Sequence, residues 1–215
     1  MKQAEAKLQQ RDVAIFKWVA ASMLVAFAAA TVFITRPAPV RTGVQPARLL
    51  GDFHLTDRTG RTVSRSELRD KYLVVNFVFT SCAVSCLQVN QRMAEVQRLA
   101  ATRDDVRLVS LTVDPGTDTP AVLAQFGEKF GADTNRWLLL TGDKQRLYEL
   151  IEDSFLKRDP TAPDGGMPGG FVGTERIVLV DRTGRIRQYF DGFSLATPGA
   201  VMASLDKLSN ENRQP

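Results

Sequence analysis

Apolar residues in this chain gather in short runs that alternate with segments of helical periodicity. The runs Tyr72–Phe79 and Val106–Val113 have the composition expected of strands covered on both faces. A helical pattern follows the first run as far as Arg103, and a second helix is predicted at Pro120–Phe130, with Thr119 as its N-cap. This order of strand, helix, strand and helix predicts a parallel core joined by right-handed crossovers.

Turn residues mark the remaining elements of the domain. The sequence Asp-Arg-Thr-Gly at residues 57–60 predicts a hairpin at the start of the domain, and the same turn at residues 181–184 predicts another. The Gly/Pro-rich segment Lys157–Gly173 is typical of a long loop. Further expected elements are a short strand at Trp137–Leu140, a helix at Asp143–Phe155, a strand at Glu175–Val180 and a closing helix at Pro198–Leu208.

The N-terminal region has a composition unlike the rest of the chain. Residues 13–35 form an apolar stretch of 23 residues with one charge, Lys17, which is long enough to span a bilayer as a helix. We therefore predict a short cytoplasmic tail at residues 1–12, a transmembrane anchor at 13–35, a Pro-rich linker at 36–48 and a domain at 49–211. A cleaved signal peptide is the alternative, which the length of the apolar stretch disfavours.

The charge of the chain does not indicate a nucleic-acid partner. The formal net charge is +4 and the isoelectric point is near 9.3. Basic residues are nevertheless interspersed with acidic ones from Arg48 onward, and no basic stripe with interleaved aromatic residues is present. We interpret these charges as a solvated surface, with some attraction to anionic lipid near the anchor.

Both cysteines of the chain, Cys82 and Cys86, lie where the first buried run gives way to a helical pattern. One interpretation is that they extend the buried face of an amphipathic helix, since cysteine is often fully buried. That face comprises Cys82, Cys86, Val89, Met93, Val96 and Ala100. The pair would then have a packing role alone.

The position of the cysteine pair favours chemistry over packing. Ligands of open α/β sheets bind beyond the carboxyl ends of the strands, and the start of a helix favours a thiolate over a thiol. Helical geometry would place the Cα atoms of Cys82 and Cys86 about 6 Å apart, within the range that a disulfide allows. Two thiolates could also bind a soft cation such as Cu(I), for which a third ligand would be expected nearby.

Four motifs together resemble the Sco/SenC family. They are FVFTSCAVSC (Phe77–Cys86), LTVDPGTDTP (Leu111–Pro120), WLLLTG (Trp137–Gly142) and ERIVLVDRTGRI (Glu175–Ile186). The resemblance covers about Leu49 to Leu208. It implies an α/β, thioredoxin-like fold, in which helices flank a central mixed sheet with an extra N-terminal β-hairpin, on a single N-terminal transmembrane helix.

The resemblance also implies a function. Family members bind copper and assist assembly of the binuclear copper centre of cytochrome c oxidase, as metallochaperones, as thiol reductants, or both. It assigns the metal thiolates to Cys82 and Cys86, and the client to the copper-site subunit of a haem-copper oxidase or another cysteine-containing protein. The protein would be a single-pass protein of the inner (cytoplasmic) membrane with its C-terminal domain facing the periplasm.

The sequence departs from the family at the third copper ligand. The family has a histidine two residues ahead of the position of Glu175, where this chain has Gly173, and Ala83 replaces a proline that often follows the first cysteine. Met167 carries a soft thioether that could substitute, although a packing role is the more frequent one for such a residue. The single histidine, His54, lies in the first hairpin and is predicted to be a surface residue.

Two acidic residues of the second motif, Asp114 and Asp118, have alternative roles. In the family this acidic loop lies near the metal site and is associated with copper transfer. Asp-Pro and Asp-Thr-Pro sequences are also common turn and cap signals. We predict that Asp114 and Asp118 have a structural role.

Three functions remain open from the sequence. The first is a membrane-anchored assembly factor that handles copper, with Cu(I) favoured over Cu(II) because the histidine is missing. The second is a metal-independent thiol-disulfide oxidoreductase that cycles Cys82 and Cys86 between dithiol and disulfide. The third is a non-catalytic, membrane-tethered binding module in which the cysteines have no chemical role.

Overall fold

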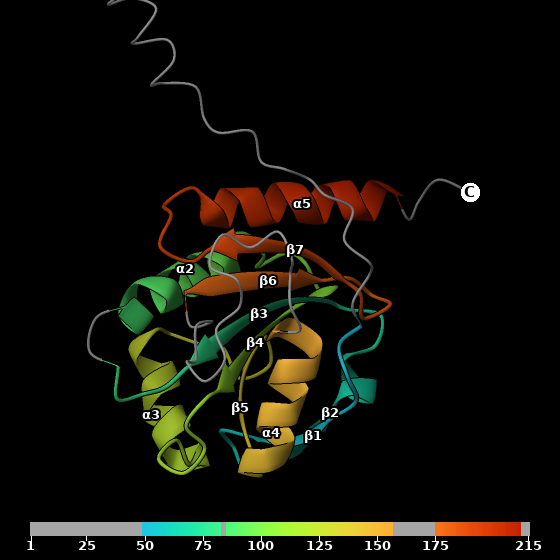
Figure 1. Ribbon diagram of the computed structural model, residues 1–215. Helices are drawn as coiled ribbons and strands as arrows, with labels where there is room; N and C mark the ends of the chain where they lie inside the picture. Colours follow the sequence, from blue (N-terminus) through green and yellow to red (C-terminus); the bar gives the residue numbers. More distant parts are fainter. Residues whose placement is uncertain (1–48, 83–84, 157–174, 212–215) are drawn as a thin grey trace, which may run out of the picture. The chain divides into compact units, whose positions relative to one another are not determined.

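The protein is represented by a computed structural model that describes residues 49–82, 85–156 and 175–211 (Figure 1). Every strand and helix predicted within these ranges is found, and the boundaries differ by a few residues. The strands are β1 (His54–Asp57), β2 (Thr62–Ser64), β3 (Tyr72–Val78), β4 (Val106–Thr112), β5 (Trp137–Thr141), β6 (Arg176–Val180) and β7 (Ile186–Asp191). The helices are η1 (Arg65–Leu68), α2 (Ser85–Leu99), α3 (Pro120–Lys129), α4 (Lys144–Ile151), η2 (Glu152–Leu156) and α5 (Thr197–Glu211).

The described strands form one mixed sheet in the order β2-β1-β5-β4-β3-β6-β7. Strands β3, β4 and β5 are parallel, as predicted, whereas β1 runs antiparallel to β5 and β6 runs antiparallel to β3. The carboxyl ends of the three parallel strands therefore meet at one edge of the sheet. A mixed sheet that carries the β1–β2 hairpin at one edge confirms this part of the predicted fold class, whereas the predicted transmembrane helix lies outside the described residues.

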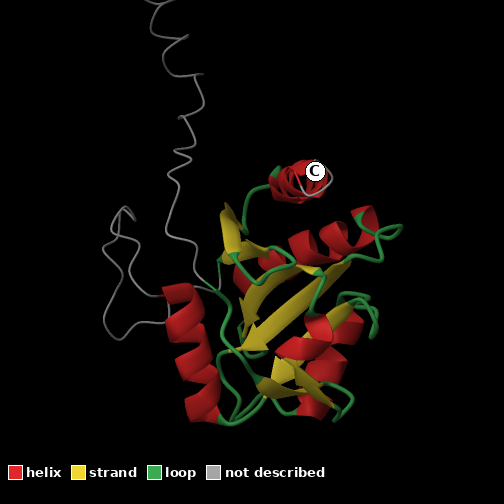
Figure 2. Cartoon of the chain, turned by 90° about the vertical axis from the view of Figure 1, so that its right-hand side faces the viewer, coloured by secondary structure: helices red, strands yellow, loops and turns green. Residues whose placement is uncertain are grey.

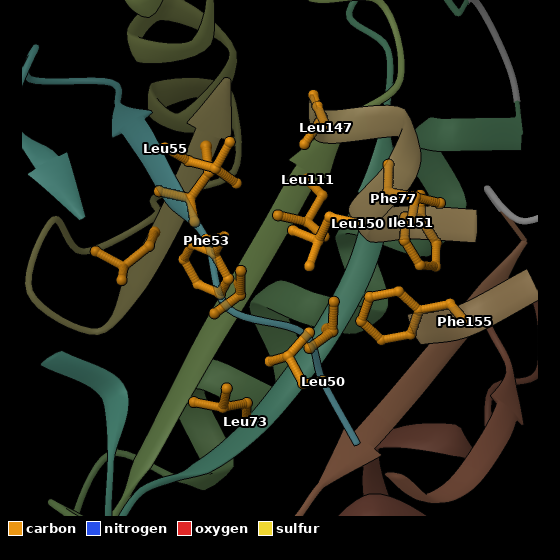
Figure 3. Close-up of a cluster of buried hydrophobic side chains, with 14 of the residues drawn as sticks. Leu50, Phe53, Leu55, Leu73, Phe77, Leu111, Leu147, Leu150, Ile151 and Phe155 are labelled. Carbon is orange, nitrogen blue, oxygen red and sulfur yellow. The ribbon is translucent and has the colours of Figure 1, made fainter. Parts of the chain in front are cut away.

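Helices cover both faces of the sheet (Figure 2). On one face, Leu147, Leu150 and Ile151 of α4 pack against alternate residues of the central strands, such as Leu73 and Phe77 of β3 (Figure 3). On the other face, α2, α3 and α5 pack against the intervening strand residues. Because β3 is buried on both faces, all seven of its side chains are apolar apart from Asn76 and the hydroxyl of Tyr72.

Helix α2 is fixed to the sheet by the apolar stripe that the sequence predicts. Val89, Met93 and Val96 are fully buried, and Ala100 is 3% exposed. Burial of each large side chain of this kind stabilises the fold by about 1.5 to 3 kcal/mol. The N-terminal end of α2, which follows the cysteine loop, is therefore held against the sheet.

The repeated Asp-Arg-Thr-Gly sequence makes the same turn twice. The Oδ1 atom of Asp57 accepts hydrogen bonds from the backbone and hydroxyl of Thr59 and from the backbone of Arg61, and Asp181 makes the equivalent three bonds. Burial raises the pKa of both carboxyls, but these hydrogen bonds outweigh burial and leave each pKa below its usual value. The last residue of the second turn, Gly184, has a φ of +84°, which a glycine adopts without strain.

The predicted tail, anchor and linker, at residues 1–12, 13–35 and 36–48, lie outside the described residues. Among residues 49–82, 85–156 and 175–211, no helix has both the length and the apolar character needed to cross a bilayer. The described chain begins beside the β6–β7 turn, where the backbone N–H of Leu50 donates to the carbonyl of Gly184 at 2.8 Å.

Candidate functional site

The cysteine loop connects the carboxyl end of β3 to the start of α2 (Figure 1). After β3 ends at Val78, the backbone N–H of Cys82 donates to the carbonyl of Phe79 at 3.2 Å, which makes a turn. Helix α2 begins at Ser85, so Cys82 lies ahead of the helix and not within it. The interpretation of both cysteines as two positions of one helical face is therefore wrong for Cys82.

The two cysteines differ in exposure and are close to one another. Cys86 is 1% exposed, whereas Cys82 is partly exposed, and no disulfide joins them in the structure. The backbone N–H of Cys86 donates to the sulfur of Cys82 at 3.3 Å. A sulfur that accepts an N–H bond at the start of a helix is favoured as a thiolate, which is the nucleophilic and metal-binding form. Cys82 is thus the more exposed cysteine of the pair.

Asp118 fixes the loop that carries Cys82. Its carboxylate is fully buried and accepts hydrogen bonds from the backbone N–H of Thr80, at 3.2 Å, and from the hydroxyl of Thr80, at 2.6 Å. The hydroxyl of Thr112, at the end of β4, also donates to this carboxylate. Asp118 therefore ties the cysteine loop to the neighbouring strand, which supports the structural role predicted for it.

Asp114 shapes the acidic loop between β4 and α3 through its backbone. Its N–H donates to the hydroxyl of Thr112 at 3.0 Å, and its carbonyl accepts from the backbone N–H of Thr117 and of Asp118. The next turn leads into α3, where the hydroxyl of Thr119 accepts from the backbone N–H of Val122, as expected of an N-cap. The acidic loop is thus a network of turns and caps beside the cysteine loop.

A chain of buried polar side chains runs from Cys86 into the centre of the sheet. The amide of Asn90 donates to the carbonyl of Cys86 at 2.7 Å, and its oxygen accepts from the amide of Asn76 at 3.2 Å. The oxygen of Asn76 accepts from the hydroxyl of Ser110 at 2.5 Å, which in turn accepts from the indole N–H of Trp137 at 2.8 Å. The first turn of α2 is thereby linked to β3, β4 and β5.

Sequence reasoning missed this chain of polar residues. Asn76 and Asn90 are fully buried, and neither was singled out from the sequence. The available signal is a lone asparagine within the apolar run YLVVNFVF, because a buried amide requires hydrogen-bond partners. Asn90 carries a second signal, since it lies four residues after Cys86 on the buried side of the helix.

His54 is not near the cysteines. It is exposed at the start of β1, as predicted, and β5 and β4 separate β1 from β3. Three inter-strand steps of about 4.8 Å amount to about 14 Å across the sheet. His54 therefore does not belong to the cysteine site.

The proposed third-ligand positions, Met167 and Gly173, lie outside the described residues. Strand β6, which follows them in sequence, begins at the edge where β3 ends, because Ile177 pairs with Asn76. Within the described part of the chain, no group of three His, Cys, Asp or Glu side chains is placed to hold a metal ion. Cys82 and Cys86 contribute two soft sulfur atoms to the described part of the site.

Comparisons with known proteins agree on one family. A model of the SCO1/SenC family matches residues 41–210. A SCO1/SenC family lipoprotein from Bacillus anthracis is similar in structure, with a TM-score of 0.65 and 26% identity over 78% of this chain and 99% of that protein. Copper-bound ScoI from Bradyrhizobium japonicum has a TM-score of 0.58 and 28% identity over 74% of this chain and 98% of its own. The SCO1 protein homolog of Bacillus subtilis is 27% identical over 141 residues, or 65% of this chain and 72% of the relative.

Proposed function

The chain belongs to the SCO1/SenC family, and on this premise we propose that it is a Sco-type assembly factor for cytochrome c oxidase that handles Cu(I) through Cys82 and Cys86. The observation that carries the proposal is the placement of the two sulfurs. The sulfur of the partly exposed Cys82 lies 3.3 Å from the backbone nitrogen of Cys86, at the carboxyl edge of the parallel strands. Copper is the cargo in this proposal, which the two cysteines accept and pass on to a client protein.

Two thiolates are sufficient for this cargo in its reduced state. Cu(I) accepts soft sulfur ligands and can be bound by two of them, whereas Cu(II) prefers nitrogen. The family's histidine position is Gly173 in this chain, and Met167 is a weaker candidate for a third ligand. The protein is therefore proposed to bind Cu(I) in preference to Cu(II).

A second candidate function is metal-independent disulfide reduction. It is favoured by the same proximity of the two cysteines, since the backbone nitrogen of Cys86 lies 3.3 Å from the sulfur of Cys82. The Cys82 thiolate would attack a disulfide of a client protein and form a mixed disulfide, and Cys86 would then displace the client sulfur. The client gains two electrons and two protons as a dithiol, the pair becomes a disulfide, and an external dithiol must reduce it for another cycle.

The location and partners belong to the same proposal. We propose that residues 13–35 anchor the chain in the inner membrane and that the domain faces the periplasm, as the length of the apolar stretch and the family resemblance support. The client would be the copper-site subunit of a haem-copper oxidase or another cysteine-containing protein.

An anaerobic Cu(I) competition titration of the full chain, reduced and held in a non-ionic detergent, tests the proposal. The wild-type protein is expected to bind one Cu(I) tightly, and Cys82→Ser and Cys86→Ser are expected to abolish tight binding. Ser81→Ala is the matched control, since it removes one exposed hydroxyl next to Cys82 and should leave the affinity unchanged.

The Gly173→His variant separates the two candidate functions. If the wild-type protein binds Cu(I) weakly and Gly173→His binds it tightly, copper handling is refuted and the disulfide function is favoured. That function is then measured as reduction of a disulfide-bonded client peptide by the wild-type protein, which Cys82→Ser should abolish. A protein whose cysteines can be replaced without loss of oxidase assembly in cells would refute both.

A further inference from the structure

A pocket with a basic lining lies at the end of the sheet opposite the cysteine loop. Its volume is about 340 Å³, and it is formed by the segment between β2 and β3 and by the β6–β7 turn. Four cationic side chains and two carboxylates contribute to it. The lining residues that carry charge are Arg65, Arg69, Asp70, Lys71, Asp181 and Arg182.

Two of the guanidinium groups are held in place by the fold. The guanidinium of Arg65 lies directly over Gly184, where a Cβ atom would come within 1.8 Å of it, and it donates to the carbonyl of Thr183 at 3.3 Å. The guanidinium of Arg182 lies 4.8 Å from the centre of the Tyr72 ring. Because both groups are already oriented, an anion that binds them does not have to order them.

The cations of the pocket lining outnumber its carboxylates, and two of these cations have no carboxylate partner among the described residues. Asp181 is committed to the β6–β7 turn, where its Oδ1 accepts three hydrogen bonds and its Oδ2 pairs with Arg187 at 3.1 Å. Arg69 is exposed, and no described residue forms an ion pair with its guanidinium. Arg65 pairs with the exposed carboxylate of Asp52 at 3.4 Å, and Arg182 pairs with Asp105 at 2.9 Å. Among the described residues, Arg69 and Lys71 are therefore the cations of the lining that have no carboxylate partner, and Asp70 is the lining carboxylate outside the turn.

We infer that this pocket binds an oxyanion of the phosphate class. Planar guanidinium groups match the geometry of phosphate oxygens, and a cluster of them supplies both charge and several donors. The ligand could be the headgroup of an anionic phospholipid or free inorganic phosphate. The site is separate from the cysteines, because the length of β3, seven residues at about 3.3 Å each, lies between them.

The first described residues, Leu49 and Leu50, contact the β6–β7 turn that lines the pocket. Leu49 forms a bridge with Arg185, and Leu50 bonds to Gly184, which lines the pocket. The first described residues of the chain therefore lie beside the basic pocket. An anionic headgroup bound there would turn the cysteine edge of the sheet away from the lipid surface.

Protection of arginines from phenylglyoxal, measured by mass spectrometry on the full chain, tests the inference. Arg69 reports on the pocket, and Arg146, an exposed arginine of α4, is the internal control. One arm adds inorganic phosphate to the chain in non-ionic detergent, against chloride at equal ionic strength. The other compares nanodiscs of phosphatidylcholine with nanodiscs that also contain phosphatidylglycerol.

We expect the modification of Arg69 to slow at least twofold while that of Arg146 is unchanged. Protection by phosphate in detergent identifies a free oxyanion as a sufficient ligand, and protection confined to phosphatidylglycerol nanodiscs identifies the lipid headgroup. Loss of one pocket cation, in Arg65→Gln or Arg182→Gln, should raise the ligand concentration for half-protection about fivefold. Lys129→Gln, an equal charge change on α3, should not.

Either of two results would overturn the inference. One is the absence of Arg69 protection in both arms, and the other is an equal response of Arg69 and Arg146, which indicates unspecific attraction. Cys82→Ser should leave Arg69 protection intact, so the outcome is independent of the proposed copper or disulfide function. Two pocket variants are used so that a folding defect in one does not remove the test.

Discussion

Replacement of Asp118 by alanine should weaken both the fold and the cysteine loop. The buried carboxylate accepts hydrogen bonds from the backbone and hydroxyl of Thr80 and from the hydroxyl of Thr112. Asp118→Ala leaves these three donors without their acceptor. Since Cys82 follows Thr80 by two residues, the loop that carries Cys82 loses its attachment to β4.

The size of the effect follows from the number and burial of these bonds. A buried donor left without a partner costs about 1 to 3 kcal/mol, and bonds to a charged acceptor lie at the upper end. The two hydroxyls can rotate toward other acceptors, which recovers part of the loss, whereas the backbone N–H of Thr80 cannot. We therefore expect the free energy of unfolding to fall by about 2 to 4 kcal/mol.

Urea unfolding followed by circular dichroism measures the loss, with Asp114→Ala as the matched control. Asp114 lies in the same loop and contributes its backbone to the turn, so its side chain should be replaceable at about 0.5 kcal/mol or less. The rate at which a disulfide reagent modifies the Cys82 thiol should change in Asp118→Ala and stay the same in Asp114→Ala. Equal destabilisation by the two variants would refute the assigned role of Asp118.

Three further predictions concern the buried polar side chains linked to Cys86, the stability at acid pH that Asp105 provides, and the buried apolar face of α2. Asn90→Ala should lower the free energy of unfolding by about 1 to 3 kcal/mol, because it leaves a buried amide without its acceptor, and a neutral result in urea unfolding would contradict this. The hydrogen bond from Arg103 lowers the pKa of Asp105 to about 2, below its unfolded value, so its stabilisation is present above about pH 4 and is lost as the pH falls through 2. Asp105→Asn should therefore cost about 1 to 2 kcal/mol at pH 7, after allowance for solvent screening, and flatten acid unfolding between pH 4 and 2. Met93→Ala should cost about 2 to 5 kcal/mol by calorimetry, against less than about 1 for the partly exposed Leu99→Ala on the same helix.

The layout of the domain could be predicted from the sequence because it depends on local patterns. Apolar runs of strand length, such as Tyr72–Phe79, and the helical stripe from Val89 to Ala100 require burial in any fold that the chain adopts. The two Asp-Arg-Thr-Gly turns likewise follow from hydrogen bonds between neighbouring residues. The family and the cysteine pair were also evident from ordered motifs.

The residue at which α2 begins could not be predicted from the sequence. The spacing of Cys82 and Cys86 fits a helical face, and the stripe continues with Val89, so periodicity alone extends the helix too far. In the structure, a turn at Phe79 and the bonds of Thr80 to Asp118 hold Cys82 ahead of the helix. These bonds join residues 38 positions apart, and no local pattern specifies them.

The sequence by itself determined the strands, the helices, the turn chemistry and the pair of cysteines that we propose as ligands, because each depends on residue type and short-range spacing. The tertiary structure alone decided which cysteine is more exposed, which carboxylate fixes the cysteine loop, and which polar side chains connect Cys86 to the sheet. It also decided that arginines from two distant segments, at Arg65 and Arg182, share one pocket. These features depend on contacts between residues far apart in the chain, which form when the sheet brings its strands into register.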